Sequence, residues 1–345
     1  MVDPLQGKHI PVSPTEALEL FTALANTLKN EYEGERLLFV GFAETATAIG
    51  AQVAISVGAK YIQTTREPIS GVEYLFFSEE HSHATEQKLV KDDIDAVADE
   101  TDRIIFVEDE VTTGKTILNI ITILDRLYEG RFSYSVASLL NGMDETNLAI
   151  YADKKIRLHY LVKTNHSGYI DRAERYAGDG EYVVCSENNV ASSLCLPGHM
   201  DTRRLVDAAV YSEACAGLWN DIRRSVFEGL APKERTILVI GTEECMYPAL
   251  YIGRELEKEG NTVRSHSTTR SPIAVSSEKD YPLHCRYELK SLYDSERRTF
   301  IYDIGEYDEV LVVTDADRCD ADEGLATLLD AISRYNKKIT VIRWC

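Results

Sequence analysis

The sequence predicts an α/β protein of two units, each built on a mainly parallel sheet covered by helices. The length of 345 residues suits two domains of ordinary size. Hydrophobic residues make up 44% of the chain and charged residues 27%, which supplies enough apolar side chains for two cores. Short, continuously apolar runs alternate with helical patterns, and this alternation is typical of parallel strands buried on both faces.

The first unit is expected to span residues 1–165, and a helix opens it. Ser13, Pro14 and Glu16 form the start of this helix: a serine cap, a proline in the first turn and a glutamate three residues after the cap. Apolar runs predict five strands, at Leu37 to Val40, Tyr74 to Phe77, Ile104 to Val107, Val136 to Leu140 and Leu158 to Val162. Further helices are predicted at Thr45 to Val57 and at Thr116 to Tyr128.

A polar stretch with scattered glycines, residues 166–203, is expected to be a connector or an arm. The second unit then spans residues 204–345 and begins with a helix at Arg204 to Val226. Its strands are predicted at Ile237 to Ile240, Thr262 to Arg264, Val310 to Val313 and Ile339 to Ile342.

The two halves share short strings in the same order. GERLLFVGFAETA in the first half corresponds to KERTILVIGTEEC in the second. The hexapeptide TTREPI (Thr64 to Ile69) corresponds to TTRSPI (Thr268 to Ile273), with a single mismatch, and FVEDE corresponds to VVTDAD. Any two α/β units share strands and helices, but the common hexapeptide favours a degenerate duplication.

Charge and cysteine content limit the classes of function. The formal charge of −20 argues against nucleic acid and anionic membranes as partners, because clustered Lys and Arg bind these. The weakly polar stretch Val40 to Ala59 is a strand that turns into a helix and not a membrane span, and the N-terminus does not resemble a signal peptide. The seven cysteines form no CxxC pair, so we expect reduced thiols, no zinc site and a cytoplasmic location.

The segment Arg103 to Ile120 carries the most informative pattern. An apolar strand leads into Glu108 and Asp109, then into a Thr-Thr-Gly-Lys-Thr loop (Thr112 to Thr116), and then into an apolar helix. Unpaired N–H groups and the positive end of the dipole lie at such a helix start, and Gly114 lets the chain approach an anion closely. The loop therefore suits a phosphate monoester.

Two nucleotide-binding motifs are excluded. A Walker A loop ending in Gly114-Lys115-Thr116 needs a glycine at the position of Asp109, where a carboxylate would repel a triphosphate. No GxGxxG dinucleotide fingerprint occurs. An ordinary strand-to-helix loop without a ligand is the remaining alternative.

The string VEDEVTTGKT resembles the phosphoribosyl pyrophosphate (PRPP) signature of type I phosphoribosyltransferases, which replace the pyrophosphate of PRPP with a nitrogenous base. The resemblance implies that Glu108 and Asp109 bind the ribose hydroxyls. It implies that the 5-phosphate is bound by Thr112, Thr113, Gly114, Lys115 and Thr116. The cofactor implied is Mg²⁺, held through PRPP with no direct protein ligand expected except a contact of Asp109.

The same resemblance assigns a pyrophosphate site and a flexible lid. The pyrophosphate loop falls on Ala43, Glu44, Thr45 and Ala46, and Arg66 stands where orotate-type members present a basic residue. Glu44 departs from the pattern, because an acid beside pyrophosphate is unhelpful unless magnesium intervenes. The lid falls on Ser78 to Lys88, where His81, Ser82 and His83 are the candidate residues. A solvated loop without a role and a two-histidine metal site are the alternatives there.

Nearly the whole chain resembles two-part proteins of tellurium-resistance and related stress gene clusters. These proteins join an orotate-like phosphoribosyltransferase domain to a domain named for a Thr-Arg-Ser-Pro motif, present here as Thr269 to Pro272. The resemblance implies a homodimeric enzyme that uses PRPP and an unidentified base to make a nucleoside-like metabolite. A PRPP-sensing or scaffold protein without catalysis, and a phosphorylase-like reverse reaction, stay open as alternatives.

The second unit lacks the TGKT loop and has Ala-Asp-Arg-Cys-Asp after Asp315. These carboxylates would repel a phosphate, so we expect this unit not to bind PRPP and instead to form a dimer surface or cover the acceptor site. Glu244 and Arg270 are expected to form either a polar pocket or a buried ion pair.

Overall fold

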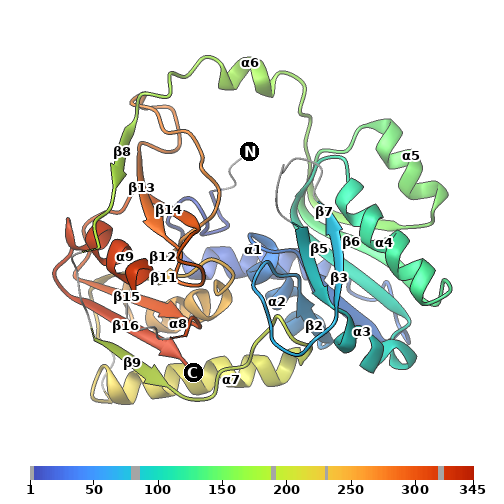
Figure 1. The fold of residues 1–345 in the computed structure, drawn as a ribbon, viewed down its shortest axis with the longest axis horizontal. Helices are drawn as coiled ribbons and strands as arrows, with labels where there is room; N and C mark the ends of the chain where they lie inside the picture. Colours follow the sequence, from blue (N-terminus) through green and yellow to red (C-terminus); the bar gives the residue numbers. More distant parts are fainter. Residues whose placement is uncertain (1–3, 79–85, 188–191, 230–231, 318–321) are drawn as a thin grey trace. The chain divides into compact units, whose positions relative to one another are not determined.

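A computed structural model describes the chain except for residues 1–3, 79–85, 188–191, 230–231 and 318–321 (Figure 1). The chain divides into two compact units. The first unit consists of Glu19–His166 and Met200–Glu213, and the second unit of Met1–Leu18, Ser167–His199 and Ala214–Cys345. The sequence-based division at residues 165 and 204 stays a prediction.

A six-stranded sheet with the order β10-β2-β1-β5-β6-β7 forms the centre of the first unit. Its strands are β1 (Leu37–Gly41), β2 (Lys60–Gln63), β5 (Arg103–Val111), β6 (Ser133–Asn141), β7 (Arg157–Lys163) and β10 (Val206–Asp207). Only β10 runs antiparallel to its neighbour, and all the other pairs are parallel. The mainly parallel sheet predicted from the apolar runs is confirmed.

Helices lie on both sides of this sheet. The helices of this part of the chain are α1 (Pro14–Asn26), α2 (Ala46–Val57), α3 (Lys91–Val97), the 3-10 turn η1 (Ala98–Glu100), α4 (Lys115–Leu127) and α5 (Glu145–Asp153). Figure 1 shows α2 and α4 on opposite sides of the sheet. Small residues let α2 approach closely: a Cβ on Gly50 would lie 3.0 Å from the Cα of Gly41 in β1.

Two predicted strands differ from the expected buried, parallel type. Strand β3 (Tyr74–Ser78) pairs antiparallel with β4 (Glu86–Val90) in a separate two-stranded sheet. Its side chains alternate, since Leu75 is buried and Phe76 is 48% exposed. Strand β7 lies at the sheet edge, where Val162 is 51% exposed. Continuous apolar runs do not by themselves distinguish these half-exposed strands from central ones.

A five-stranded parallel sheet, β12-β11-β15-β16-β9, forms the centre of the second unit, beside a three-stranded sheet, β14-β13-β8. The strands are β8 (Glu181–Val184), β9 (Ser193–Leu196), β11 (Thr236–Gly241), β12 (Thr262–Ser267), β13 (Cys285–Lys290), β14 (Arg298–Tyr302), β15 (Glu309–Thr314) and β16 (Ile339–Trp344). The remaining helices are α6 (Tyr169–Ala173), α7 (Ala208–Ser225), α8 (Tyr247–Lys258) and α9 (Glu323–Ser333). Strands β8 and β9 come from the segment expected to be a connector.

The two parallel sheets are wound in the same order. In the first unit β1 lies between β2 and β5, and β6 follows β5; in the second unit β11 lies between β12 and β15, and β16 follows β15. An antiparallel pair is inserted at the same point, β3 with β4 in the first unit and β13 with β14 in the second. This common order supports the duplication inferred from the sequence.

The expectation of reduced cysteines is wrong for one pair. Cys195 of β9 and Cys345 form a disulfide, which joins the end of the chain to the edge strand next to β16. Among the other described cysteines, Cys185, Cys215, Cys245 and Cys285 are not joined in disulfides. The two cysteines come together because β9 and β16 pair, and their separation of 150 residues concealed this.

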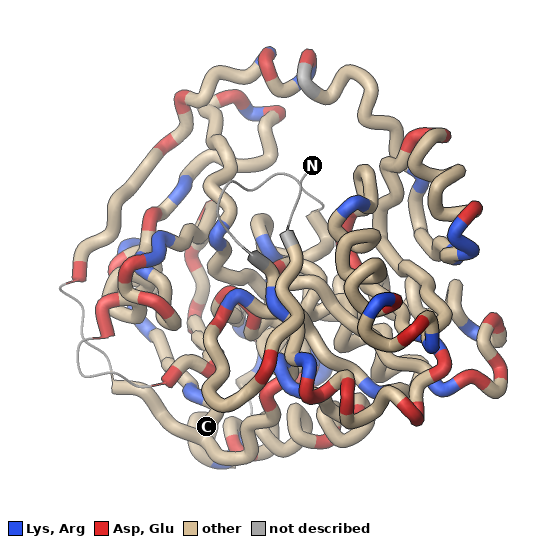
Figure 2. Tube along the Cα trace, turned by 45° about the vertical axis from the view of Figure 1, so that its right-hand side comes forward, with Lys and Arg blue, Asp and Glu red and all other residues tan. Residues whose placement is uncertain are grey.

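Charged residues of both signs are interspersed along the chain. Figure 2 shows acidic and basic positions interleaved, without a continuous basic stretch in the described parts of the chain. Among the same residues, no helix combines the length and the apolar character that crossing a bilayer requires.

Candidate functional site

The candidate site lies at the carboxyl ends of β1, β2 and β5 in the first unit. Gly41, the last residue of β1, pairs with Gln63 on one side and with Val107 on the other. Ligands of open α/β sheets bind at this edge, where the loops to the following helices begin. The loops predicted to bind pyrophosphate and 5-phosphate both leave from it.

Glu108 and Asp109 lie within β5 and not after it. The sequence predicted a strand ending at Val107, but β5 continues to Val111 because it keeps pairing with β6. Successive residues of a strand point to opposite faces, so Glu108 and Glu110 share one face and Asp109 points to the other. The side chains of both predicted ribose ligands are partly exposed.

Gly114 forms the turn between β5 and α4. Its φ of 74° lies in the left-handed region, and an added Cβ would lie 2.3 Å from the hydroxyl of Tyr151 and 2.6 Å from Cε of Met143. That hydroxyl donates a hydrogen bond of 2.7 Å to the Gly114 carbonyl. Burial, with a smaller effect from the charge of Glu108, raises the pKa of Tyr151, so the phenol remains a donor. Glycine is therefore required at this turn.

Helix α4 begins directly after this glycine, at Lys115. The N–H groups of a first helical turn have no partner inside the helix, and the positive end of the dipole lies there. Thr112, Thr113 and Thr116 are partly exposed around the turn, and Lys115 is exposed. Backbone N–H groups, hydroxyls and an ammonium group therefore surround one small region, which is the donor set that an anion needs.

Side chains outside the predicted pyrophosphate loop, Ala43 to Ala46, hold its backbone in place. The N–H of Ala43 donates to Oγ1 of Thr64 at 2.8 Å, and the Thr64 hydroxyl donates to Gln87 at 2.6 Å. The Gln87 amide donates in turn to the Ala43 carbonyl at 2.5 Å. The peptide bond between Ala43 and Glu44 is cis, and the side chains of residues 44 and 45 are partly exposed.

Arg66 lies just beyond the end of β2. The residue before it, Thr65, forms a backbone bridge with Lys88 through N–H···O bonds of 2.8 and 3.0 Å. The buried Thr65 hydroxyl also accepts the N–H of Glu67 at 2.9 Å. These bonds fix the backbone on both sides of Arg66, whose side chain is partly exposed.

The candidate lid residues His81, Ser82 and His83 lie outside the described residues. The strands that flank them, β3 and β4, form the antiparallel pair described above.

The sequence did not point to a second pair of side chains at this edge, Glu110 and His166. Oε1 of Glu110 lies 2.9 Å from Nε2 of His166, and the hydroxyl of Thr164 lies 3.1 Å from the same nitrogen. A Cβ on Gly142 would lie 2.1 Å from that nitrogen, so the imidazole packs directly on the glycine backbone. His166 follows the last predicted strand of the first unit. This position at the carboxyl end of a strand was the one feature of the sequence that could have indicated a site residue.

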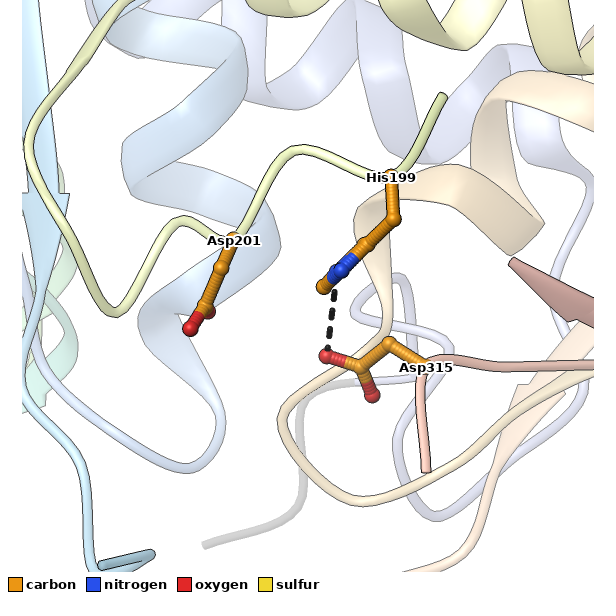
Figure 3. A group of neighbouring side chains, drawn as sticks. All are labelled: His199, Asp201 and Asp315. Atoms are coloured by element: carbon orange, nitrogen blue, oxygen red, sulfur yellow. Dashed lines mark ion pairs between the residues drawn. The ribbon is translucent and has the colours of Figure 1, made fainter. Parts of the chain in front are cut away.

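At the corresponding edge of the second unit, Arg270 and Glu244 form the buried ion pair that was one of the two expectations. Their side chains are 7% and 0% exposed, and the N···O distance is 2.8 Å. Asp315 holds the register position of Asp109, because Gly241 pairs with Val313 as Gly41 pairs with Val107. Nε2 of His199 lies 3.6 Å from a carboxylate oxygen of Asp315 (Figure 3).

Two family models match the chain. A model described as phosphoribosyl transferase matches residues 1–167. A model described as the TRSP domain C-terminal to that transferase matches residues 207–332. No curated protein is similar enough in sequence to be matched.

Solved adenine phosphoribosyltransferases are among the similar structures. The protein from Rhodothermus marinus is 17% identical, with a TM-score of 0.32, and the match covers 43% of this chain and 80% of that one. The protein from Thermoanaerobacter pseudethanolicus is 18% identical, with a TM-score of 0.31 and coverages of 44% and 82%. The protein from Giardia lamblia, complexed with 9-deazaadenine, is 17% identical, with a TM-score of 0.33 and coverages of 44% and 82%.

The α/β fold and the family match together define a phosphoribosyltransferase, an enzyme that transfers a phosphoribosyl group. Within that class, the chain belongs to the family in which the transferase domain is followed by a TRSP domain.

Proposed function

We propose that the first unit transfers the 5-phosphoribosyl group of PRPP to a nitrogen of a base-like acceptor and releases pyrophosphate. The bond between C1 of the ribose and the pyrophosphate oxygen breaks, a bond from C1 to the acceptor nitrogen forms, and the acceptor loses a proton. The observation that carries this proposal is the Gly114 turn, which combines a helix start, three threonines and a lysine with two carboxylates on the preceding strand. The family match supports it independently.

The predicted phosphate, ribose and pyrophosphate residues of the first unit each have a role in this proposal. Thr112 to Thr116 bind the 5-phosphate. Glu108 and Asp109 accept hydrogen bonds from the ribose hydroxyls and reach them from opposite faces of β5. The loop Ala43 to Ala46 and Arg66 bind the pyrophosphate, for which a guanidinium is well suited. Positioning and electrostatic stabilisation supply the catalysis, so the protein needs no nucleophile.

The acidic residues at this edge also fit Mg²⁺, which prefers carboxylate and phosphate oxygens as ligands. Glu44, Glu108 and Asp109 are partly exposed acidic residues in or beside the two loops. When bound with PRPP, the ion would neutralise charge on the leaving pyrophosphate. The protein's part is then to hold the ribose, through Glu108 and Asp109.

Isothermal titration of the full-length protein with PRPP, with and without Mg²⁺, tests the binding step. We expect magnesium-dependent binding that the double substitution Asp109→Asn with Thr113→Ala abolishes. Asp315→Asn is the matched control, because Asp315 holds the same register position in the second unit and should leave binding unchanged. Unchanged binding in the double variant would refute the site.

Turnover is tested separately, by pyrophosphate release from PRPP in the presence of a panel of nitrogenous bases. Release that depends on both PRPP and one base supports transfer and identifies the acceptor of the nucleoside-like metabolite. Binding of PRPP without release under any base would favour a PRPP-sensing protein. The homodimer expected from the resemblance stays a prediction, which light scattering of the full-length protein checks.

A further inference from the structure

The loop after β11 in the second unit is built like the loop after β1 in the first. The N–H of Glu243 donates to Oγ1 of Thr268 at 3.0 Å, as the N–H of Ala43 donates to Oγ1 of Thr64 at 2.8 Å. Residue 243 therefore holds the place of residue 43. The backbone of Thr269 bridges Phe300, as the backbone of Thr65 bridges Lys88, and this places Arg270 as the counterpart of Arg66.

The side chain at this position distinguishes the two units, because the second unit has Glu243 where the first has alanine. The Glu243 side chain is 1% exposed. Its Oε2 accepts a hydrogen bond from Nε of Arg270 at 2.8 Å and lies 3.4 Å from the guanidinium of Arg297, while its Oε1 accepts from the Ser291 hydroxyl at 2.5 Å. Two guanidinium groups and a hydroxyl thus surround this buried carboxylate, and they can bind a small oxyanion. Arg270 uses Nε for Glu243 and Nη2 for Glu244, so the two carboxylates take different edges of its guanidinium.

The backbone of Glu243 adopts an unfavourable conformation at the position where its carboxylate contacts Arg270, Arg297 and Ser291. Its φ of 46° lies in the left-handed region, which a residue with a Cβ rarely adopts. The ammonium group of Lys8, itself fully buried, donates a 2.7 Å hydrogen bond to the Glu243 carbonyl. The loop is thus fixed from the backbone side as well as from the side-chain side.

We propose that the second unit keeps an oxyanion-binding cradle, formed by Arg270, Arg297 and Ser291, and that the carboxylate of Glu243 occupies it as an internal ligand. The cradle is closed to external anions in the native protein and takes a small carboxylate or similar oxyanion once Glu243 is removed. The inference stands on these contacts and does not depend on the proposed reaction of the first unit.

The substitution Glu243→Gly in the full-length protein tests the proposal, because glycine removes the carboxylate and suits the positive φ. Propionate is the probe, since it matches the side chain that is lost. Both tryptophans, Trp219 and Trp344, belong to the second unit, so their fluorescence reports its melting. We expect the melting temperature to fall by roughly 10 °C, as for a broken buried ion pair, and to be restored saturably by propionate but not by chloride at equal ionic strength.

Glu309→Ala is the matched control. Glu309 is also a buried carboxylate of this sheet, but its partners Lys338 and Arg235 are 53% and 46% exposed, so they do not enclose a cradle. Propionate should not restore the melting temperature of this variant, and it should not change the melting temperature of the wild-type protein. A saturable response of the wild type, or equal responses of the two variants, would overturn the proposal.

A second variant covers the case in which Glu243→Gly does not fold. If that variant folds only in the presence of propionate, the cradle is confirmed. If it folds in neither buffer, Glu243→Gln decides: an amide cannot satisfy two guanidinium groups, so we expect a lower melting temperature that propionate does not restore. A Gln variant as stable as the wild type would show that the carboxylate is not required, which overturns the proposal.

Discussion

The turn at Gly114 shows how a single residue determines the candidate site. The sequence predicted this glycine from the strand, loop and helix pattern. It did not reveal the two side chains that make glycine necessary, those of Met143 and Tyr151, and Tyr151 lies 37 residues further along the chain. Such neighbours become visible only when β6 and α5 pack beside the loop.

Gly114→Ala tests this requirement. An alanine would adopt an unfavourable φ and also overlap the Tyr151 hydroxyl, so we expect a loss of about 3 kcal/mol in the free energy of unfolding, together with loss of PRPP binding. Urea denaturation and isothermal titration measure the two effects.

Gly58→Ala is the control for the unfavourable φ alone, without a side-chain overlap. Gly58 caps α2 with a φ of 78°, and nothing lies within 4 Å of an added Cβ. The free energy of unfolding of this variant should fall by about 1 kcal/mol, and PRPP binding should be retained. Equal losses in the two variants would show that the Tyr151 contact does not constrain the turn.

At the scale of elements, the duplicated threonines offer a matched pair of substitutions. Thr64 and Thr268 are buried, and each hydroxyl accepts the backbone N–H at the equivalent position of its loop, Ala43 or Glu243. Replacing either with valine keeps the shape and leaves that N–H without its acceptor, which costs about 1–3 kcal/mol. We expect both variants to lose stability, and Thr64→Val to lose more, because that change also removes the hydrogen bond from the Thr64 hydroxyl to Gln87.

Only Thr64→Val should weaken PRPP binding, by about tenfold, because only that loop is proposed to hold pyrophosphate. Isothermal titration of both variants under magnesium measures this difference. Weaker PRPP binding in Thr268→Val, or unchanged PRPP binding in Thr64→Val, would contradict the assignment of the loop.

The strands that sequence analysis found and missed differ in the length of their apolar runs. Strands β1, β5 and β15 form continuous apolar runs, and these were predicted. Strand β2 (KYIQ) is mostly buried but has only two apolar residues, between Lys60 and Gln63, and β13 (CRYELK) alternates charged with apolar residues because one face is open. Short or interrupted runs of this kind give no clear periodic pattern.

At the scale of the whole molecule, the two units differ in where one strand comes from. In the first unit β7 follows β6 along the chain and pairs with it. In the second unit the strand beside β16 is β9, which precedes every other strand of that sheet in sequence. A strand of four residues within a polar segment gave no periodic pattern, so the segment was expected to be a connector.

The chain also returns to the first unit after that segment. Strand β10 pairs with β2, and the buried carboxylate of Asp93 accepts two hydrogen bonds from Arg204, at 2.7 and 2.8 Å, and one from the N–H of Leu205 at 3.0 Å. Residues 200–213 therefore belong to the packing of the first unit.

A fragment of residues 1–165 should consequently be less stable than a fragment of residues 1–213. The shorter fragment leaves Asp93 without Arg204 and β2 without its neighbour, so we expect its free energy of unfolding to be lower by about 3 kcal/mol. Circular dichroism during urea denaturation measures the difference. In the longer fragment, Asp93→Asn should remove most of the gain, whereas Asp99→Asn, at a fully exposed site, should not. Equal midpoints for the two fragments would place the boundary of the first unit at residue 165, where the sequence alone had put it.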